Sequence, residues 1–179
     1  MITASMPAPA LSFVIPLYRS AETIPPANLP SRYLRTKAFS TAIYFLLTSD
    51  TFSALHRLPT DEIYHFYLGD PVELLQLYPD GASARVVLGQ DILNRQHVQY
   101  VAPREVWQGA RLLPGGRFAL LGTTMAPAFT SDDYRGGDRE ALLRQYPAQA
   151  ELIRTLTRPT EAQRMPPGAG MHFPPIAGS

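Results

Sequence analysis

The stretch FSALHRLPTDEIYHFYLGDP, residues 52–71, carries the clearest structural pattern in this chain. Two short runs of aliphatic and aromatic residues are joined by Pro-Thr-Asp and closed by Gly-Asp-Pro. This pattern is typical of two β-strands bounded by turns. The same strands carry His56, Glu62 and His65. We therefore expect a functional site as well as a strand pair in this part of the chain.

Similar short runs continue on both sides of this stretch. They are separated by turn residues such as Pro79-Asp80-Gly81 and Pro114-Gly115-Gly116. The predicted strands are Ser40–Leu47, Thr51–Arg57, Glu62–Leu68, Val72–Tyr78, Arg85–Leu88, Val98–Val101, Val106–Leu112 and Phe118–Met125. Because no helical pattern lies between them, they predict an all-β fold, an antiparallel double-sheet jelly-roll barrel.

The segments outside these strands differ in composition. Asp138 can cap a helix over residues 139–145, and Pro147 begins a second helical piece, so we expect short C-terminal helices packed outside the barrel. Three prolines in residues 23–30 predict an extended arm. We expect one barrel domain over residues 18–158, an N-terminal segment over residues 1–17 that can be flexible, and a disordered Pro/Gly-rich tail over residues 159–179.

Composition narrows the function classes. The 179 residues carry a net charge of +1 and no basic run, which argues against nucleic-acid binding. Because the chain has no cysteine, disulfides, thiolate metal sites and cysteine nucleophiles are excluded. Residues 1–16 lack the basic start of a signal peptide and the apolar length of a membrane span. We expect a cytoplasmic protein with no membrane partner.

Alternation along the strands predicts which side chains share the barrel interior. His56 and Phe52 lie on one face of their predicted strand, and Glu62, Tyr64 and Phe66 lie on one face of the next. We expect all five to face inward, with His56 and Glu62 as a catalytic acid–base pair and the aromatic residues against the substrate. The alternative is a hydrogen-bonded polar pair that only joins two strands.

Three more side chains are candidates for substrate binding. Gln108 offers a donor and an acceptor, which suits a carbonyl or hydroxyl group. Tyr44 can orient a substrate oxygen, and Arg19 can pair with a carboxylate. The alternation turns His65 and Trp107 to the opposite faces of their strands, so we expect a structural role for His65.

The spacing within residues 52–71 also matches a known motif. His56, Glu62 and Gly69 fall on the first His, the Glu and the closing Gly of H-x-H-x3-E-x6-G, the first motif of the cupin superfamily. Leu58 stands in place of the second His. Metal-binding cupins gather two His, this Glu and a later His on one ion, so the set is incomplete in this chain.

The second cupin motif, P-x-G-x-x-H, has its counterpart in PREVWQ, where Pro103 matches, Glu105 replaces the Gly and Gln108 replaces the His. Together with the segments STAIYFLLT and VWQGARL, these motifs resemble the cupin-5, or DUF985, family of single-domain cupins. The resemblance extends over about Tyr18 to Arg158. The resemblance implies a barrel with a pocket. Because few strong ligands remain, we expect no metal or other cofactor.

The leading hypothesis is a cupin-type small-molecule enzyme with metal-independent acid–base chemistry. It would act as an isomerase, epimerase, dehydratase or cyclase on a hydroxylated metabolite, a sugar or a natural-product intermediate. One alternative is a metal-dependent oxygenase or lyase with a divalent metal on His56 and Glu62. Another is a non-catalytic ligand-binding cupin. The resemblance also implies a homodimer, which would protect exposed edge strands.

Overall fold

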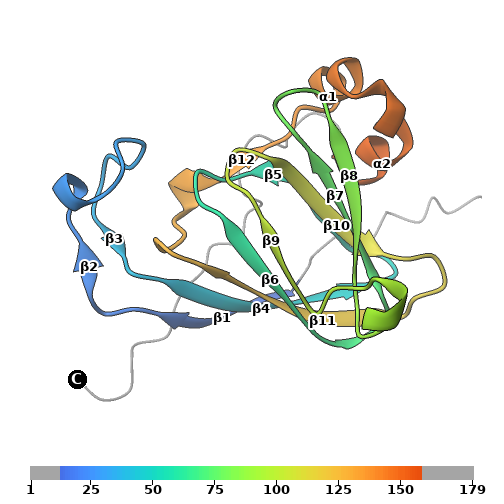
Figure 1. Cartoon of the computed structure of the whole chain (residues 1–179), viewed down its shortest axis with the longest axis horizontal. Coiled ribbons are helices and arrows are strands. Elements are labelled where there is room, and N and C mark those ends of the chain that lie inside the picture. Colours follow the sequence, from blue (N-terminus) through green and yellow to red (C-terminus); the bar gives the residue numbers. More distant parts are fainter. Residues whose placement is uncertain (1–12, 159–179) are drawn as a thin grey trace, which may run out of the picture.

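The structure of this chain is a computed structural model that describes residues 13–158. Two five-stranded antiparallel sheets face each other and enclose the core, and a two-stranded arm extends from one side (Figure 1). The expectations for residues 1–12 and for the tail at 159–179 fall outside the described residues.

The two sheets take their strands alternately from the chain. The first sheet has the order β1 (Phe13–Arg19), β4 (Thr41–Thr48), β11 (Phe118–Met125), β6 (Glu62–Gly69), β9 (Gln99–Ala102). The second sheet has the order β12 (Arg135–Gly136), β5 (Phe52–Arg57), β10 (Trp107–Leu112), β7 (Val72–Leu77), β8 (Ser83–Leu88). This double-sheet order confirms the predicted jelly-roll barrel.

The predicted strands correspond to β4 to β11, with similar bounds. The strand β1 was not predicted, and because it begins at Phe13, residues 13–17 belong to the first sheet rather than to a separate N-terminal segment. Pro16 interrupts the apolar run there, which hides the strand pattern in the sequence, and the pairing with β4 shifts register next to it.

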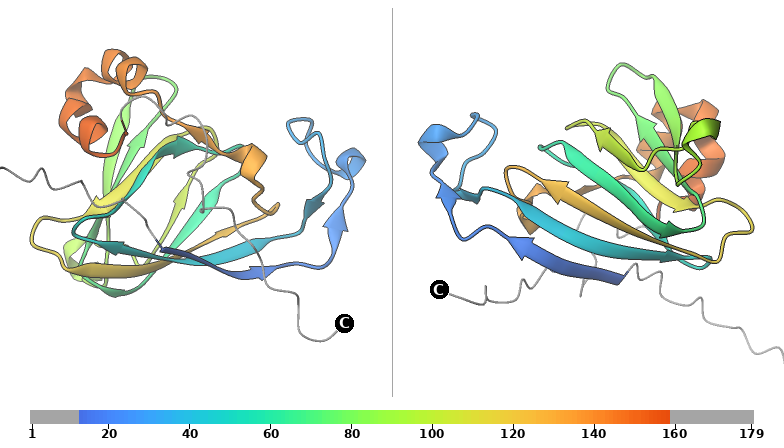
Figure 2. Two further views of the ribbon diagram at one scale, coloured as in Figure 1. Left: turned by 180° about the vertical axis from the view of Figure 1, so that it is seen from behind. Right: turned by 60° about the horizontal axis from the view of Figure 1, so that its bottom comes forward.

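Two short helices lie on the outer side of the second sheet, as predicted (Figures 1 and 2). They are α1 (Arg139–Gln145) and α2 (Ala150–Thr155), and the carboxylate of Asp138 caps α1 by accepting a hydrogen bond from the Ala141 amide at 2.8 Å. Their apolar side chains bury the outer face of the sheet in a cluster of Leu55, Leu75, Leu77, Leu142, Tyr146, Leu152, Ile153 and Leu156. The described residues also contain four 3₁₀ turns: η1 (Pro26–Asn28), η2 (Ile92–Asn94), η3 (Ser131–Asp133) and η4 (Pro147–Gln149).

The interior between the two sheets is divided into two regions. One region is an apolar core of Phe45, Leu47, Tyr64, Phe66, Val72, Leu74, Leu88, Ala102, Ala110, Leu112, Ala119 and Leu121. The other region holds buried polar side chains from both sheets, among them His56, Glu62 and Gln108. Next to these polar groups lies a smaller apolar cluster of Leu58, Met125 and Phe129, with Tyr134 packed against it, so apolar packing flanks the polar groups on more than one side.

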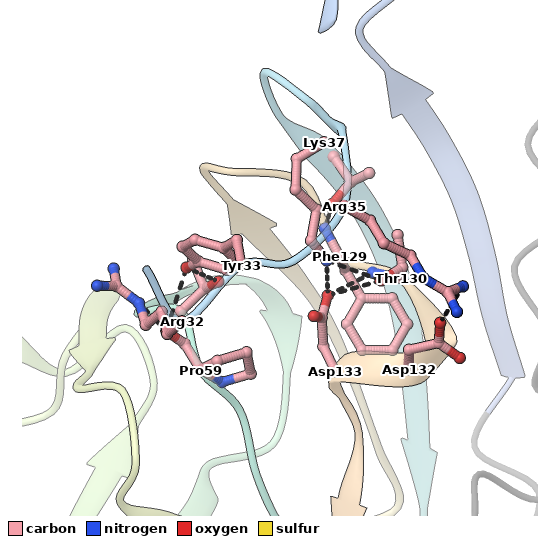
Figure 3. Close-up of polar contacts among 11 residues, drawn as sticks. Arg32, Tyr33, Arg35, Lys37, Pro59, Phe129, Thr130, Asp132 and Asp133 are labelled. Atoms are coloured by element: carbon pink, nitrogen blue, oxygen red, sulfur yellow. Dashed lines mark hydrogen bonds and ion pairs between the residues drawn. The ribbon is translucent and has the colours of Figure 1, made fainter. Parts of the chain in front are cut away.

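The arm formed by β2 (Thr23–Ile24) and β3 (Lys37–Ala38) is fastened to the barrel by hydrogen bonds. The Tyr33 hydroxyl lies 2.5 Å from the Thr60 hydroxyl and donates to the Pro59 carbonyl at 3.1 Å (Figure 3). The Lys37 ammonium reaches Asp133 of η3. These contacts come from Tyr33 and Lys37, whereas most of the arm predicted over residues 23–30 is exposed and includes the 3₁₀ turn η1.

Glu105 has a left-handed backbone, with φ of 61°, at the position where the second cupin motif has Gly. A residue with a side chain in this conformation is strained by about 1–2 kcal/mol. Glycine removes this strain, but it also makes the unfolded chain more flexible, so only part of the strain energy appears as a gain in stability. We expect Glu105→Gly to raise the free energy of unfolding by about 0.5–1 kcal/mol in a urea titration. The neighbouring Arg104→Gly should lower it, and an equal loss in both variants would contradict this account.

Candidate functional site

Six polar side chains meet in the barrel interior. His56, Gln108 and Gln76 are neighbours in register across β5, β10 and β7, and they face three residues of the first sheet. We call this set the polar band: His56, Gln76 and Gln108 of the second sheet, and Glu62, Tyr64 and Tyr100 of the first. Hydrogen bonds join the two sheets at Gln108–Glu62 and at Gln76–Tyr100. The structure therefore brings His56, Glu62, Tyr64 and Gln108 together, as the strand alternation predicted.

His56 is held in one orientation by its backbone and by an aromatic neighbour. Its Nδ1 donates a hydrogen bond to the Ala54 carbonyl at 2.8 Å, because a carbonyl oxygen can only accept. The ring stacks on Tyr134, with 5.0 Å between the ring centroids. In the neutral imidazole, Nε2 then carries the free lone pair. This Nε2 lies 3.7 Å from Oε2 of Glu62.

Glu62 is buried, at 7% exposure, and its carboxyl group accepts hydrogen bonds from two sides. The Gln108 amide donates to Oε2 at 2.8 Å, and the Tyr64 hydroxyl also bonds this carboxyl group. Burial, and then the negative charge of Glu62, raise the pKa of Tyr64 well above its ordinary value. The Tyr64 hydroxyl therefore keeps its proton at neutral pH and acts as a donor.

Phe52 lies on the opposite face from His56, contrary to our expectation. It packs against the cluster under the helices, and Arg111 is its partner on β10. The cause is a β-bulge: His56 pairs with Gln108 but Ser53 pairs with Ala110, so β5 has one more residue than β10 over this stretch. A bulge reverses the alternation, and the sequence alternation alone does not reveal it.

The other three expected substrate-binding residues are not members of the polar band, although Phe66 shares an apolar cluster with Tyr64 of that band. Phe66 faces inward but belongs to the apolar core. Tyr44 contradicts its expected role, because it lies on the outer face of the first sheet, edge to face with Tyr67 at 5.2 Å. Arg19 is exposed and is three strands from Glu62, about 14 Å at 4.8 Å per strand. The structure thus assigns none of these three to the pair His56–Glu62.

His65 and Trp107 face away from the polar band, as predicted. His65 lies on the outer face of the first sheet, with Nε2 at 2.9 Å from the Thr124 hydroxyl and its ring stacked on Tyr67. Burial lowers the pKa of His65. Trp107 packs on the cluster under the helices, where Arg57 lies 4.9 Å from its ring centroid. These contacts give both residues structural roles.

Three residues at the site were not found from the sequence: Gln76 and Tyr100 of the polar band, and Tyr134, which stacks on His56. Tyr134 follows η3 in a loop far along the chain, and burial, opposed by Arg158 and assisted by Glu62, raises its pKa. Gln76 is fully buried in β7, in a strand that reads VELLQL. A polar amide in alternation with Val72 and Leu74, on the apolar face of this strand, is the signal that could have identified it.

The donor set does not fit a catalytic transition-metal site. Among residues 13–158, no group of three or more His, Cys, Asp and Glu side chains is close enough to hold an ion. His56 and Glu62 supply two ligands, and Gln108 adds only an amide that already donates to Glu62. Three strong protein ligands with an open position are usual for catalytic zinc, so the pair alone is insufficient.

Comparison with known proteins identifies the family. A family model described as "Cupin superfamily (DUF985)", Cupin_5, matches residues 7–136. The chain belongs to this cupin family. The match confirms the resemblance seen in the two motifs, although it begins before Tyr18 and ends before the helices.

Relatives of this cupin come from distant organisms. An uncharacterized protein of Saccharomyces cerevisiae is 29% identical over 102 residues, 55% of this chain and 51% of that protein, so the chain spans about half the length of this relative. The X-ray structure of a Shewanella oneidensis protein has a TM-score of 0.73 at 29% identity and covers 84% of this chain and 89% of its own. A hypothetical protein from Leishmania major has a TM-score of 0.72 at 23% identity, covers 85% and 92%, and supports the fold alone.

Within residues 13–158 of this cupin, no helix has the length and apolar character needed to cross a membrane. The two α-helices are both short and lie on the outer side of the second sheet.

Proposed function

We propose that this cupin is a small-molecule enzyme that moves a proton on a hydroxylated substrate, with His56 as the base and Glu62 as its partner. One observation supports this function above the others. Nε2 of His56 and Oε2 of Glu62 lie 3.7 Å apart in the barrel interior, and both residues are more than nine-tenths buried. A buried imidazole–carboxyl pair is a common arrangement for general acid–base chemistry.

In the proposed reaction each group has a distinct part. Nε2 of His56 takes a proton from a carbon next to a substrate carbonyl, and the electron pair of that C–H bond passes into an enolate. The imidazolium then faces Glu62, which stabilises its charge. Returning the proton to the neighbouring carbonyl carbon, while the substrate hydroxyl proton passes to the former carbonyl oxygen, gives an isomerase. An epimerase needs a proton on the opposite face of the same carbon, and therefore a second proton donor besides His56. Tyr64 and Gln108 hold the Glu62 carboxyl group in place.

Deuterium exchange tests this function even when the substrate is unidentified. A proton held on His56 exchanges with solvent, so a substrate turned over in D2O gains deuterium at carbon. We expect the purified protein, incubated with a cell extract in D2O, to add one mass unit to a hydroxylated carbonyl compound. EDTA should leave the rate unchanged. Absence of any such mass increment would contradict the proposal.

Two other functions remain as alternatives. A metal-dependent oxygenase or lyase would need ligands beyond His56 and Glu62, and the donor set described above does not favour it. A non-catalytic ligand-binding cupin fits the same buried polar groups. It differs from an enzyme in the exchange experiment, because a bound metabolite would be recovered without deuterium.

We also propose that two copies of this cupin associate through β1. This strand is the edge of the first sheet, with β4 as its one neighbour among the described strands, and Ile15, Leu17 and Tyr18 are 55%, 42% and 50% exposed. Unpaired edges with apolar side chains favour association. We expect light scattering to give about 40 kDa, twice the 19.8 kDa of the chain. Ile15→Glu should shift the mass toward the monomer, whereas Leu93→Glu, in the exposed turn η2, should not.

A further inference from the structure

Two buried amides in the polar band are each satisfied at one end only. Gln76 is fully buried, and Gln108 is 1% exposed. Within residues 13–158, the Nε2 atom of Gln76 and the Oε1 atom of Gln108 have no hydrogen-bond partner. A buried amide group without a partner is rare, because it loses the hydrogen bonds that water would give it.

The opposite end of each amide is held by the fold. Oε1 of Gln76 accepts hydrogen bonds from the hydroxyl groups of Tyr78 and Tyr100, both at 2.8 Å. Nε2 of Gln108 donates to Glu62 at 2.8 Å. These bonds fix both amide planes, so the free Nε2 of Gln76 and the free Oε1 of Gln108 are presented in fixed directions. Turning either amide over would still leave one of its two polar atoms unsatisfied.

The two amides are adjacent as well as fixed. Gln76 and Gln108 are partners in the register of β7 and β10, and both face the first sheet. Directly paired residues have Cβ atoms about 4.5–5.5 Å apart. This spacing is compatible with one oxygen atom that hydrogen-bonds both free amide ends. The free amide hydrogen of Gln76 needs an acceptor and the free oxygen of Gln108 needs a donor, which a hydroxyl group supplies together.

Charge also restricts the group that can bind there. Among the described residues, Lys37 is the one buried Lys or Arg side chain, and it is paired with Asp133 outside the polar band. Glu62 adds a carboxyl group next to Gln108. A phosphate or carboxylate would lie next to an acidic group and would find no buried cation. The free-energy cost of removing this anion from water would therefore not be offset by an ion pair.

We propose that Gln76 and Gln108 form a subsite for a neutral hydroxyl group of the substrate. Gln76 donates to the hydroxyl oxygen, and that hydroxyl donates to Gln108. The subsite selects uncharged, hydroxyl-rich substrates over their phosphate esters and acids. It rests on the proposed function in placing a substrate beside His56 and Glu62, but its binding role can be measured separately.

Nuclear magnetic resonance of the side-chain amides tests this subsite. The probes are two pairs, D-glucose with D-glucose 6-phosphate, and D-xylose with D-xylonate, at millimolar concentrations on the 15N-labelled full chain. The amide signal that is absent from Gln76→Leu identifies Gln76. We expect D-glucose or D-xylose to shift this signal, with at least about fivefold weaker binding of the charged partner. In the Gln76→Leu protein the affinity should fall about tenfold, as for one lost hydrogen bond, while Gln99→Leu, the same change at an exposed position, should leave it unaltered.

Each contrary result overturns the subsite. It fails if none of the four probes shifts the Gln76 signal, if the charged partners bind equally well, or if Gln76→Leu binds as tightly as the natural chain. The titration of the natural chain decides this even if a variant does not fold. His56→Ala separates the two proposals: it should keep the amide shift and lose the deuterium exchange. A shift without any exchange would overturn the proposed reaction and leave the subsite intact.

Discussion

We expect the His56→Ala protein to catalyse deuterium exchange about 10²–10⁴-fold more slowly than the natural chain, because this is the usual contribution of a general base. Nε2 carries the only free lone pair of the neutral ring, because Nδ1 already donates to the Ala54 carbonyl, and it lies 3.7 Å from Oε2 of Glu62. Alanine removes that lone pair and exposes the carboxyl group of Glu62 to water. The measurement is the initial rate of deuterium gain by mass spectrometry, under conditions where both proteins are folded.

His65→Ala is the matched control for this variant. His65 lies close by in the chain, but its ring is on the outer face of the first sheet beside Thr124. We expect its exchange rate to stay within about twofold of the natural chain, since surface changes rarely alter a site. Equal losses in His56→Ala and His65→Ala would indicate a loss of folding, and an unchanged rate in His56→Ala would refute the role of His56.

Replacing Lys37 by methionine is expected to lower the free energy of unfolding by about 3–5 kcal/mol, the usual effect of removing one partner of a buried ion pair. Lys37 and Asp133 are only 5% and 8% exposed, and Nζ lies 2.5 Å from Oδ2 (Figure 3). Methionine leaves the Asp133 carboxylate buried with hydrogen bonds from Thr130 alone. The midpoint of a urea titration, at constant slope, measures the loss.

The Lys37–Asp133 ion pair also affects the candidate site, because Tyr134 directly follows Asp133 in the chain. Tyr134 follows Asp133 and stacks on His56, so loosening η3 should also reduce the exchange rate of Lys37→Met. Arg35→Ala provides the control, because Arg35 pairs with the adjacent Asp132 at 3.0 Å but both side chains are exposed. Exposed pairs contribute about 0–1 kcal/mol, so this variant should be nearly as stable as the natural chain. Equal effects of the two variants would refute the importance of burial at Lys37.

The barrel and the central pair were predictable from the sequence because both depend on local patterns. Strand bounds follow from apolar runs and turn residues, and the two motifs place His56, Glu62 and Gln108 on inward positions. Glu105, which stands at the Gly position of the second motif, has the left-handed backbone that glycine favours. Within a regular strand, alternation also assigned His65 and Trp107 correctly to the outer faces.

Other features depend on contacts between segments far apart in the chain. A bulge in β5 against β10 reverses the alternation of side chains and turns Phe52 toward the helices. No residue type in β5 indicates this bulge. Tyr134 reaches His56 through contacts between distant segments, because η3 before it is bonded to Lys37 of the arm and β12 after it pairs with β5. The amide ends left free at Gln76 and Gln108 depend on which hydroxyl and carboxyl groups the opposite sheet brings to them. Local residue patterns thus specify strands and facing directions, whereas long-range packing selects which polar groups meet and which remain unpaired.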